Sequence, residues 1–456
     1  MENQGGDRMN ITAVLDKTTQ AQWEIYIQHS TRTDVQLRGS KREALIRQEN
    51  TGYGVRVILP RSGGAGVGYS SCNSDKDLEA TARRAHDLAK LNRSPFFELP
   101  AKRKLLQTKT ADRRILTDSE RVAKDYADEA QALISEEKDI SLTYGKVRTY
   151  VVENQIINSR GLACKSVGTY LYVEMTLKIG SGTSATEFWP SRYSRRVSDL
   201  EPTNIILEWL KIARSCLKRH PPRTKQTTMI LTPAVVCDIF VPTIGFHSSA
   251  EAVNLNLSAF KKHQQVASEG LTIVDDGLYP YGLRTNSFDD EGQPQEKTRL
   301  IEKGVFKNYL YDQLHAQTMD AKPTGNGIRT GFGIDVDERY QTIPANDNTN
   351  LTFSGGDQSL EELIQDTKDG LMIYQAAWLN PDRITTRFGS EIRNAQEIKN
   401  GELVEGVVGG SLSGSAFELM KGISGISDRP EVVSGYAFGC VAPYIRLEGV
   451  QISGSS

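Results

Sequence analysis

TGYGVRVILPRSGGAGVGYSS, residues 51–71, contains two strand-like runs separated by a glycine-rich segment. Apolar and polar residues alternate in YGVRVILP (53–60), and VGYSS (67–71) resumes after SGGAG (62–66). Alternation with a period of two is the pattern of a half-buried strand, and glycine gives the backbone the freedom that a tight turn requires. The stretch therefore predicts an antiparallel hairpin. QWEIYIQHS (22–30) alternates in the same way, so we expect a sheet in the first part of the chain.

Helical segments are interleaved with these strands. SDKDLEATARRAHDLAKLN (74–92) repeats small or apolar residues at helical spacing behind Ser74, a good N-cap residue. Similar periodicity predicts helices over 118–136 and 202–220, with β-rich sequence over 147–180 and a turn at NSRG (158–161). Residues 1–221 are thus predicted to form an N-terminal α/β domain with a mixed sheet and helices, ending at the helix-breaking HPPR (220–223).

The second half of the chain has a different sequence pattern. A short helix is predicted after Thr232, with Pro233 at its first position, and a central helix over 249–263. Lys303-Gly304 and Asn400-Gly401 each separate two alternating runs, which predicts two hairpins. Residues 222–456 should therefore form a largely antiparallel β domain with a central helix. The predicted fold class of the whole chain is α+β.

Length and composition limit the functional classes. With 456 residues, the chain exceeds what one core usually organises, and 55 Lys+Arg balance 57 Asp+Glu. This balance, without aromatic residues among the basic pairs, gives no reason to expect nucleic-acid binding. No apolar run is long enough for a membrane span, and the first residues lack a signal-peptide core, so we expect a cytoplasmic protein. If Met9 were the true start, the first eight residues would be a flexible extension.

Candidate catalytic chemistry centres on PTIGFHSSAEAVNLN (242–256), where Glu251 follows His247 by four residues. None of the six histidines forms an HExxH pair, and the five cysteines never form a CxxC pair. Three roles for His247 stay open at this point: a ligand in a catalytic metal site with Glu251, a polar or substrate-facing residue, or a histidine in the capping region of a helix beginning near Ser248 and Ser249. DDEG (289–292) lacks the ligand spacing of a calcium loop and is interpreted as a turn.

Several sequence segments of the second half of the chain follow one another in a characteristic order. They are TIVDDGLYPYGLRTNSFDDEGQPQEKTRLIEKGVFKNYLYD (272–312), TGNGIRT (324–330), SGGDQSLEELIQDTKDGLMI (354–373), EIRNAQEIKNGELVE (391–405) and PYIRLEGVQISG (443–454). As an ordered set they closely resemble the TldD/PmbA family, also called modulators of DNA gyrase. The hairpin of residues 51–71 resembles the family's N-terminal hairpin, so the likeness covers about residues 50–454.

The resemblance implies a subunit of a cytosolic zinc metallopeptidase. The family has two branches that pair as a heterodimer, and the TldD branch carries HExxxH on a central helix with a cysteine near the C-terminus as third zinc ligand. In this chain the motif would begin at His247, but Ser248 and Ala252 occupy the positions of its glutamate and second histidine. Neither residue can perform the missing role. The chain is therefore closer to the TldE/PmbA branch. His247 and Cys440 would be vestiges of a metal site, which would need Glu251 or His263 as a further ligand to be complete.

We accordingly expect a non-catalytic TldE-like subunit that forms part of a chamber for extended or unfolded peptides. It would bind no zinc itself, and the zinc would lie in a TldD-type partner. The residues expected to line the chamber are His247, Glu251, Asn254, Gly325, Asn326 and Gly327. Two alternatives remain: a divergent hydrolase with a site rearranged around His247, Glu251 and Cys440, and a stand-alone homodimeric binding or scaffold protein.

Overall fold

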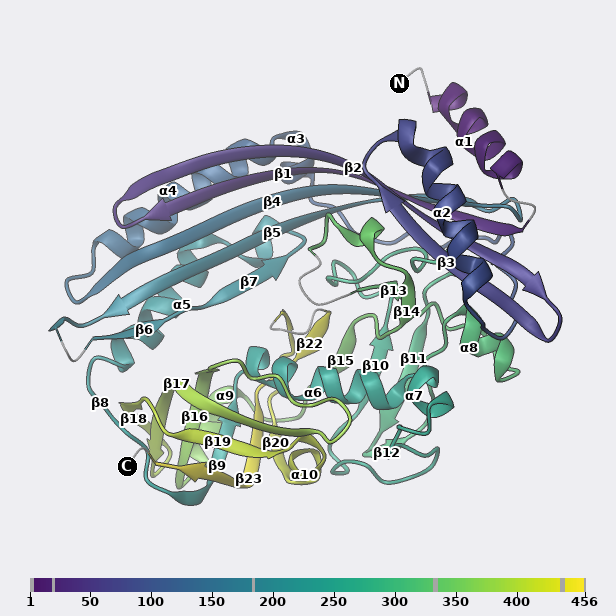
Figure 1. Cartoon of the computed structure of the whole chain (residues 1–456). Helices are drawn as coiled ribbons and strands as arrows, with labels where there is room; N and C mark the ends of the chain where they lie inside the picture. Colours follow the sequence, from purple (N-terminus) through teal and green to yellow (C-terminus); the bar gives the residue numbers. More distant parts are fainter. Residues whose placement is uncertain (1–3, 19–20, 183–184, 331–334, 435–438, 455–456) are drawn as a thin grey trace.

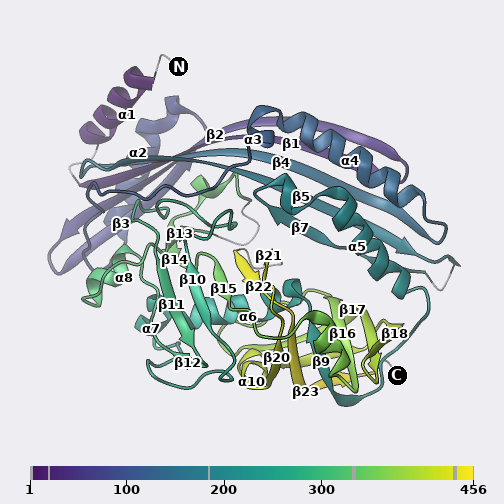
Figure 2. The same ribbon diagram turned by 180° about the vertical axis from the view of Figure 1, so that it is seen from behind.

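The computed structural model describes residues 4–18, 21–182, 185–330, 335–434 and 439–454. A long, curved N-terminal sheet lies over a C-terminal half that is built from smaller sheets around a buried helix (Figure 1). The reverse view in Figure 2 shows the same two layers, with loops of the C-terminal half between them. The α+β class is thus confirmed. Within the described ranges, no helix combines the length and apolarity needed to cross a membrane.

The N-terminal sheet has seven strands in the order β3-β2-β1-β4-β5-β6, with β7 also paired to β5. Its strands are β1 (Gln22–Arg38), β2 (Lys41–Arg61), β3 (Gly64–Cys72), β4 (Ile140–Asn158), β5 (Ala163–Ile179), β6 (Thr186–Phe188) and β7 (Ser191–Ser194). Every pairing in this sheet is antiparallel, so the mixed sheet expected here is wrong. The predicted hairpin is confirmed as β2–β3, in which Val57 pairs with Gly68.

Helices pack against this sheet through small and apolar side chains. They are α1 (Gln4–Thr18), α2 (Leu78–Leu91), α3 (Arg113–Thr117), α4 (Ser119–Ser135) and α5 (Pro202–Ser215). Ala82, Ala85 and Ala89 of α2 are fully buried, and their small size allows close contact with β2 and β3. The helix predicted over 202–220 ends at Ser215, because β8 (Arg219–His220) pairs with a strand of the C-terminal half. Residues 4–8 belong to α1.

The C-terminal half contains two larger sheets and a two-stranded one. The six-stranded sheet has the order β12-β11-β10-β15-β22-β21 and consists of β10 (Ile273–Asp276), β11 (Lys297–Glu302), β12 (Val305–Phe306), β15 (Leu351–Phe353), β21 (Glu431–Val433) and β22 (Cys440–Ala442). The eight-stranded sheet consists of β8, β9 (Lys225–Leu231), β16 (Asp369–Ala376), β17 (Arg387–Lys399), β18 (Glu402–Val407), β19 (Ser411–Ser415), β20 (Ile423–Ile426) and β23 (Ile445–Ser453). β13 (Gly327–Arg329) pairs with β14 (Pro344–Asn346).

Most pairings in this half are antiparallel, as expected. Parallel pairs occur between β15 and β22, between β9 and β16, and between β8 and β18. Both predicted hairpins are confirmed as β11–β12 and β17–β18, and Asn400 and Gly401 have φ values of 50° and 81°. Positive φ at both central residues is the signature of a type I′ turn.

Helix α6 (Pro233–Ser248) occupies the core of this half, where its side chains join those of both larger sheets in one apolar cluster. It begins after Thr232 as predicted but has 16 residues rather than being short. The helix predicted over 249–263 is wrong, because α7 (Ala250–Asn254) has only five residues. The remaining short helices are α8 (Gln313–Thr318), α9 (Leu360–Gln365) and α10 (Ala416–Lys421).

Candidate functional site

His247 lies in the last turn of α6 and is completely buried. Its ring is enclosed by three phenylalanine rings, with centroid distances of 5.2 Å to Phe246, 5.6 Å to Phe260 and 4.8 Å to Phe417. An imidazole in such a setting packs as an aromatic side chain. The surroundings favour a packing role for His247 over a substrate-facing one.

The two ring nitrogens of His247 are in different environments. The backbone N–H of Ala259 donates to Nδ1 at 3.0 Å, so the proton of the neutral ring is on Nε2. Nε2 is buried and makes no hydrogen bond of good geometry within the described residues, although the carbonyls of Arg383 and Ile384 are close enough to favour the protonated ring. Burial outweighs these carbonyls and lowers the pKa of His247 below its ordinary value of 6.5. The ring is therefore neutral near pH 7.

The chain bends directly after His247. Ser249 is extended, with φ −77° and ψ 139°, and separates α6 from α7. Backbone hydrogen bonds from Leu310 N–H to Ser248 and from Ala250 N–H to the Leu310 carbonyl hold this bend. The Ser249 hydroxyl accepts a hydrogen bond from the N–H of Ala252 at 3.1 Å, which confirms the N-cap expected in this region. His247 and Ala252 are thus on two different helices.

The other candidate ligands do not complete a metal site. Cys440 is buried on β22 among apolar residues, Glu251 is half-buried on α7, and His263 is exposed. Over the described ranges, no three His, Cys, Asp or Glu side chains come together as a metal site would require. The Nδ1 of His247 already accepts a hydrogen bond, and Ala252 supplies no donor atom. These residues do not fit a catalytic zinc, which needs three protein ligands and an open position.

The segment TGNG (324–327) is packed into the protein. The Asn326 amide is fully buried and donates to Oδ2 of Asp275 at 2.8 Å and to the carbonyl of Asp347 at 3.0 Å. A Cβ on Gly325 would lie 2.4 Å from the Pro294 carbonyl oxygen. Asn254, by contrast, is exposed on α7. Of the six residues expected to line a chamber, Asn326 and Gly325 are thus packed against neighbouring groups and Asn254 is exposed, and the chamber itself stays a prediction.

A network of buried charges joins the N-terminal sheet to these loops, and sequence reasoning missed it. Arg56 of β2 bridges Glu24 of β1 and Glu291, at 2.8 Å to each, and Arg329 reaches Glu24 at 3.0 Å. Glu291 belongs to DDEG, where Asp289 accepts hydrogen bonds from the N–H groups of Glu291 and Gln293. The predicted turn is thus present, but it also carries an ionic contact between the two halves. Burial together with neighbouring carboxylates raises the pKa of Glu291.

A groove of about 790 Å³ lies where β7 and α5 face α9 and β16. Its aromatic lining includes Trp189, whose side chain is 52% exposed although it is held firmly. The Trp189 indole N–H donates to Glu174 at 2.6 Å, and the Gln375 side-chain amide bonds both the N–H and the carbonyl of the Trp189 backbone. An exposed aromatic ring fixed in this way suits ligand contact. In the sequence, the one signal of this groove is the aromatic pair Phe188 and Trp189 before Pro190.

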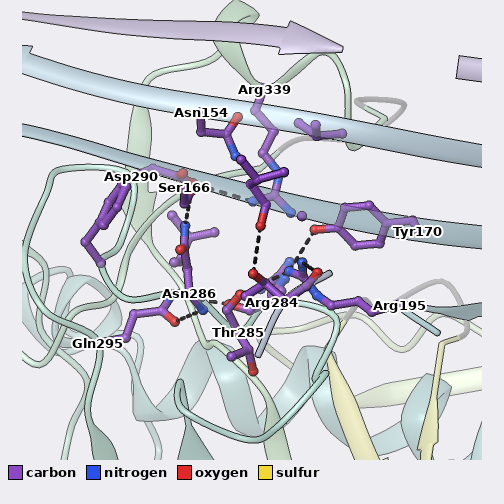
Figure 3. Close-up of a pocket in the computed structure, with 16 residues that line it drawn as sticks. Asn154, Ser166, Tyr170, Arg195, Arg284, Thr285, Asn286, Asp290, Gln295 and Arg339 are labelled. Carbon is purple, nitrogen blue, oxygen red and sulfur yellow. Dashed lines mark hydrogen bonds and ion pairs between the residues drawn. The ribbon is translucent and has the colours of Figure 1, made fainter. Parts of the chain in front are cut away.

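A second, much smaller cavity of about 20 Å³ is lined mainly by polar residues (Figure 3). Asn154 and Ser166 come from β4 and β5, and Thr285, Asn286 and Arg339 come from the C-terminal half. The cavity therefore lies at the junction of the two halves. It is too small for a peptide and large enough for about one water molecule.

Comparisons with known proteins agree along the chain. Residues 224–454 match the PmbA/TldA metallopeptidase C-terminal domain, and residues 23–89 match PmbA/TldA metallopeptidase domain 1. A metalloprotease of Methanocaldococcus jannaschii is 25% identical over 431 residues, 91% of each chain. A TldD homologue of Buchnera aphidicola is 32% identical over 202 residues, 42% of this chain and 40% of its own. The crystal structure of TldE from Thermococcus kodakarensis superposes with a TM-score of 0.85 at 22% identity, covering 98% of this chain and all of that one.

Proposed function

Because the chain belongs to the PmbA/TldD metallopeptidase family, we propose that it is a TldE-like subunit with no catalytic zinc of its own. It acts as the partner of a zinc-bearing TldD-type subunit in a cytoplasmic heterodimer and forms one wall of the chamber in which peptides are bound. In this proposal the zinc-dependent step belongs entirely to the partner.

The environment of His247 is the observation that carries the proposal. The ring is buried among phenylalanines, its Nδ1 accepts the Ala259 N–H, and the bend at Ser249 separates it from residue 252. Converting this region to a zinc site would require new donor atoms and release of the His247 ring from its hydrogen bond to Ala259. This favours a subunit without metal over a hydrolase rearranged around His247, Glu251 and Cys440.

We place the peptide contacts of this subunit in the groove beside Trp189. A volume of about 790 Å³ falls in the range of ligand sites, and the groove lies between the two halves. Its lining includes charges of both signs, with Glu361 and Asp238 beside Lys211 and with Glu208 paired to Arg192, in addition to aromatic rings. Such walls suit an extended peptide that contributes apolar and polar side chains.

Metal analysis of the purified chain, alone and mixed with a TldD-type protein of the same organism, tests the proposal. We expect well under one zinc per chain alone, a 1:1 complex on size exclusion, and cleavage of unfolded peptides by the complex only. One zinc per chain together with peptide cleavage by the isolated protein would contradict it. A stable homodimer that ignores the TldD-type protein would instead support the stand-alone alternative.

A further inference from the structure

The small cavity at the junction of the two halves has more positive charge in its lining than negative charge. Three arginines line it, Arg195, Arg284 and Arg339, and Asp290 is the one carboxylate among its described lining residues. Figure 3 shows Arg339 and Asn154 approaching from one side and Arg195 and Arg284 from the other. Arg284 is neutralised by Asp347 outside the lining, at 2.9 Å.

Among the residues that the structure describes, Arg195 is a buried cation whose hydrogen-bond partners are all uncharged. Its guanidinium is 4% exposed, stacks 4.5 Å from the centre of the Tyr170 ring, and donates to the Tyr170 hydroxyl and to the backbone carbonyls of Thr110, Gly282, Leu283 and Thr285. Burial lowers the pKa of Arg195, and the nearby Arg339 adds to this effect. A buried charge without a counter-charge is strongly unfavourable, so this site benefits from an anion nearby.

Arg339 supplies unused hydrogen-bond donors to the same cavity. Its guanidinium makes no hydrogen bond within the described part of the chain, and its nearest carboxylate oxygen, Oδ2 of Asp290, is 4.0 Å away. Asp290 also accepts the backbone N–H of Arg329 at 2.7 Å, so its charge is shared. A guanidinium carries five N–H donors, and those of Arg339, whose side chain is 16% exposed, are open to solvent or to an occupant of the cavity.

Two further lining residues present donors. Oδ1 of Asn154 accepts a hydrogen bond from Gln28 at 3.0 Å, so the amide N–H groups of Asn154 remain available as donors. Oγ of Ser166 accepts a hydrogen bond from Asn286 at 3.0 Å, so the Ser166 O–H remains available as a donor. The cavity thus combines unused donors with a surplus of about one positive charge. A volume of about 20 Å³ admits one small occupant and excludes phosphate or a peptide carboxylate.

We propose that this cavity is a binding site for a monovalent, halide-sized anion, with chloride as the occupant. The anion contacts Arg339, Asn154 and Ser166 and balances the charge of Arg195. Because these residues come from the N-terminal sheet and from the loops of the C-terminal half, bound chloride stabilises the junction between them. The proposal is independent of the peptidase assignment.

The test is thermal unfolding of the full chain in gluconate buffer, in which chloride replaces gluconate at constant ionic strength. Ligand binding to the folded state raises the Tm with ligand concentration, so we expect a saturable rise of a few degrees with chloride or bromide. An anomalous peak between Arg339 and Asn154 in crystals soaked in bromide would locate the ion. A Tm that does not depend on halide, together with a cavity that contains only water, would overturn the proposal.

Two variants, which should both lose the chloride response but for different reasons, make the test specific. Arg339→Met should abolish the halide-dependent shift. Asn154→Asp keeps the side-chain shape and brings a negative charge into the cavity, so it should make the Tm independent of chloride without lowering it in gluconate. If Asn154→Asp kept the full chloride response, the site would lie elsewhere. Arg103→Gln, which removes an exposed arginine, is the control and should respond like the wild type.

Discussion

The backbone N–H of Ala259 donates a hydrogen bond of 3.0 Å to Nδ1 of His247, from a segment twelve residues further along the chain. This bond fixes the tautomer of the ring and occupies one of the two atoms with which histidine binds metals. At the position where the family resemblance predicted the remnant of a zinc site, the structure has an aromatic cluster closed by a backbone hydrogen bond.

Replacing His247 with alanine should reduce stability and leave the metal content unchanged. The variant loses a fully buried ring and its hydrogen bond to Ala259, which corresponds to about 2–4 kcal/mol of unfolding free energy. Urea unfolding and metal analysis measure the two quantities. His263→Asn is the matched control, because His263 is exposed and asparagine tolerates its φ of 68°. Loss of bound zinc from the His247 variant alone would show that the ring is a ligand.

The lowered pKa of His247 predicts the sign of a pH effect. As the pH falls below 6.5, the unfolded chain takes up the proton before the folded chain does, so the contribution of His247 to stability decreases towards acid pH. Between pH 7.5 and 5.5 the wild type should lose up to about 1 kcal/mol more than His247→Leu. Denaturant unfolding at both pH values measures this difference. His315, whose pKa is raised by Asp312, is present in both proteins and cancels. Equal losses would mean that the ring protonates normally in the folded state.

Restoring the family motif should not restore a zinc site. The double variant Ser248→Glu, Ala252→His recreates HExxxH in the sequence, but Nδ1 of His247 still accepts the Ala259 N–H and the ring stays enclosed by Phe260 and Phe417. We expect no increase in zinc content above that of the wild type, measured on folded protein after dialysis against zinc. Binding of one zinc would show that the His247 ring is easily released from Ala259 and its aromatic neighbours.

Local sequence determines some of these features, and long-range contacts determine the others. The Asn400-Gly401 turn and the Ser249 cap were predictable, because each depends on residues within one turn of chain. The division of the central helix into α6 and α7 could not be predicted, since the bend between them is held by Leu310, about sixty residues away in sequence. The groove was equally inaccessible, because the contact that fixes Trp189 comes from Gln375.

Gly325 should be far less tolerant of alanine than Gly161, although the two have nearly the same backbone angle, with φ of 75° and 77°. A Cβ on Gly161 meets nothing within 4 Å, whereas on Gly325 it would lie 2.4 Å from the Pro294 carbonyl oxygen. Gly161→Ala should lower the free energy of unfolding by about 1 kcal/mol, the ordinary cost of a positive φ for alanine. Gly325→Ala should lower it by at least about 3 kcal/mol. Urea unfolding of both variants isolates the contact, and equal costs would contradict the packing described for the TGNG segment.

Trp189→Ala should weaken peptide binding by the heterodimer by about tenfold or more, with little change in its assembly. The ring is 52% exposed and is held in place by Glu174 and Gln375. Because it is already ordered, it loses little conformational entropy when a peptide binds, and truncation removes this contact surface. Fluorescence anisotropy with a labelled unfolded peptide measures the Kd, and size exclusion measures assembly. Trp378→Ala is the control, because Trp378 is 73% exposed and lies outside the groove lining. If both variants bound peptide like the wild type, the groove would not be part of the chamber; if Trp189→Ala prevented the heterodimer from forming, the groove would be the subunit interface.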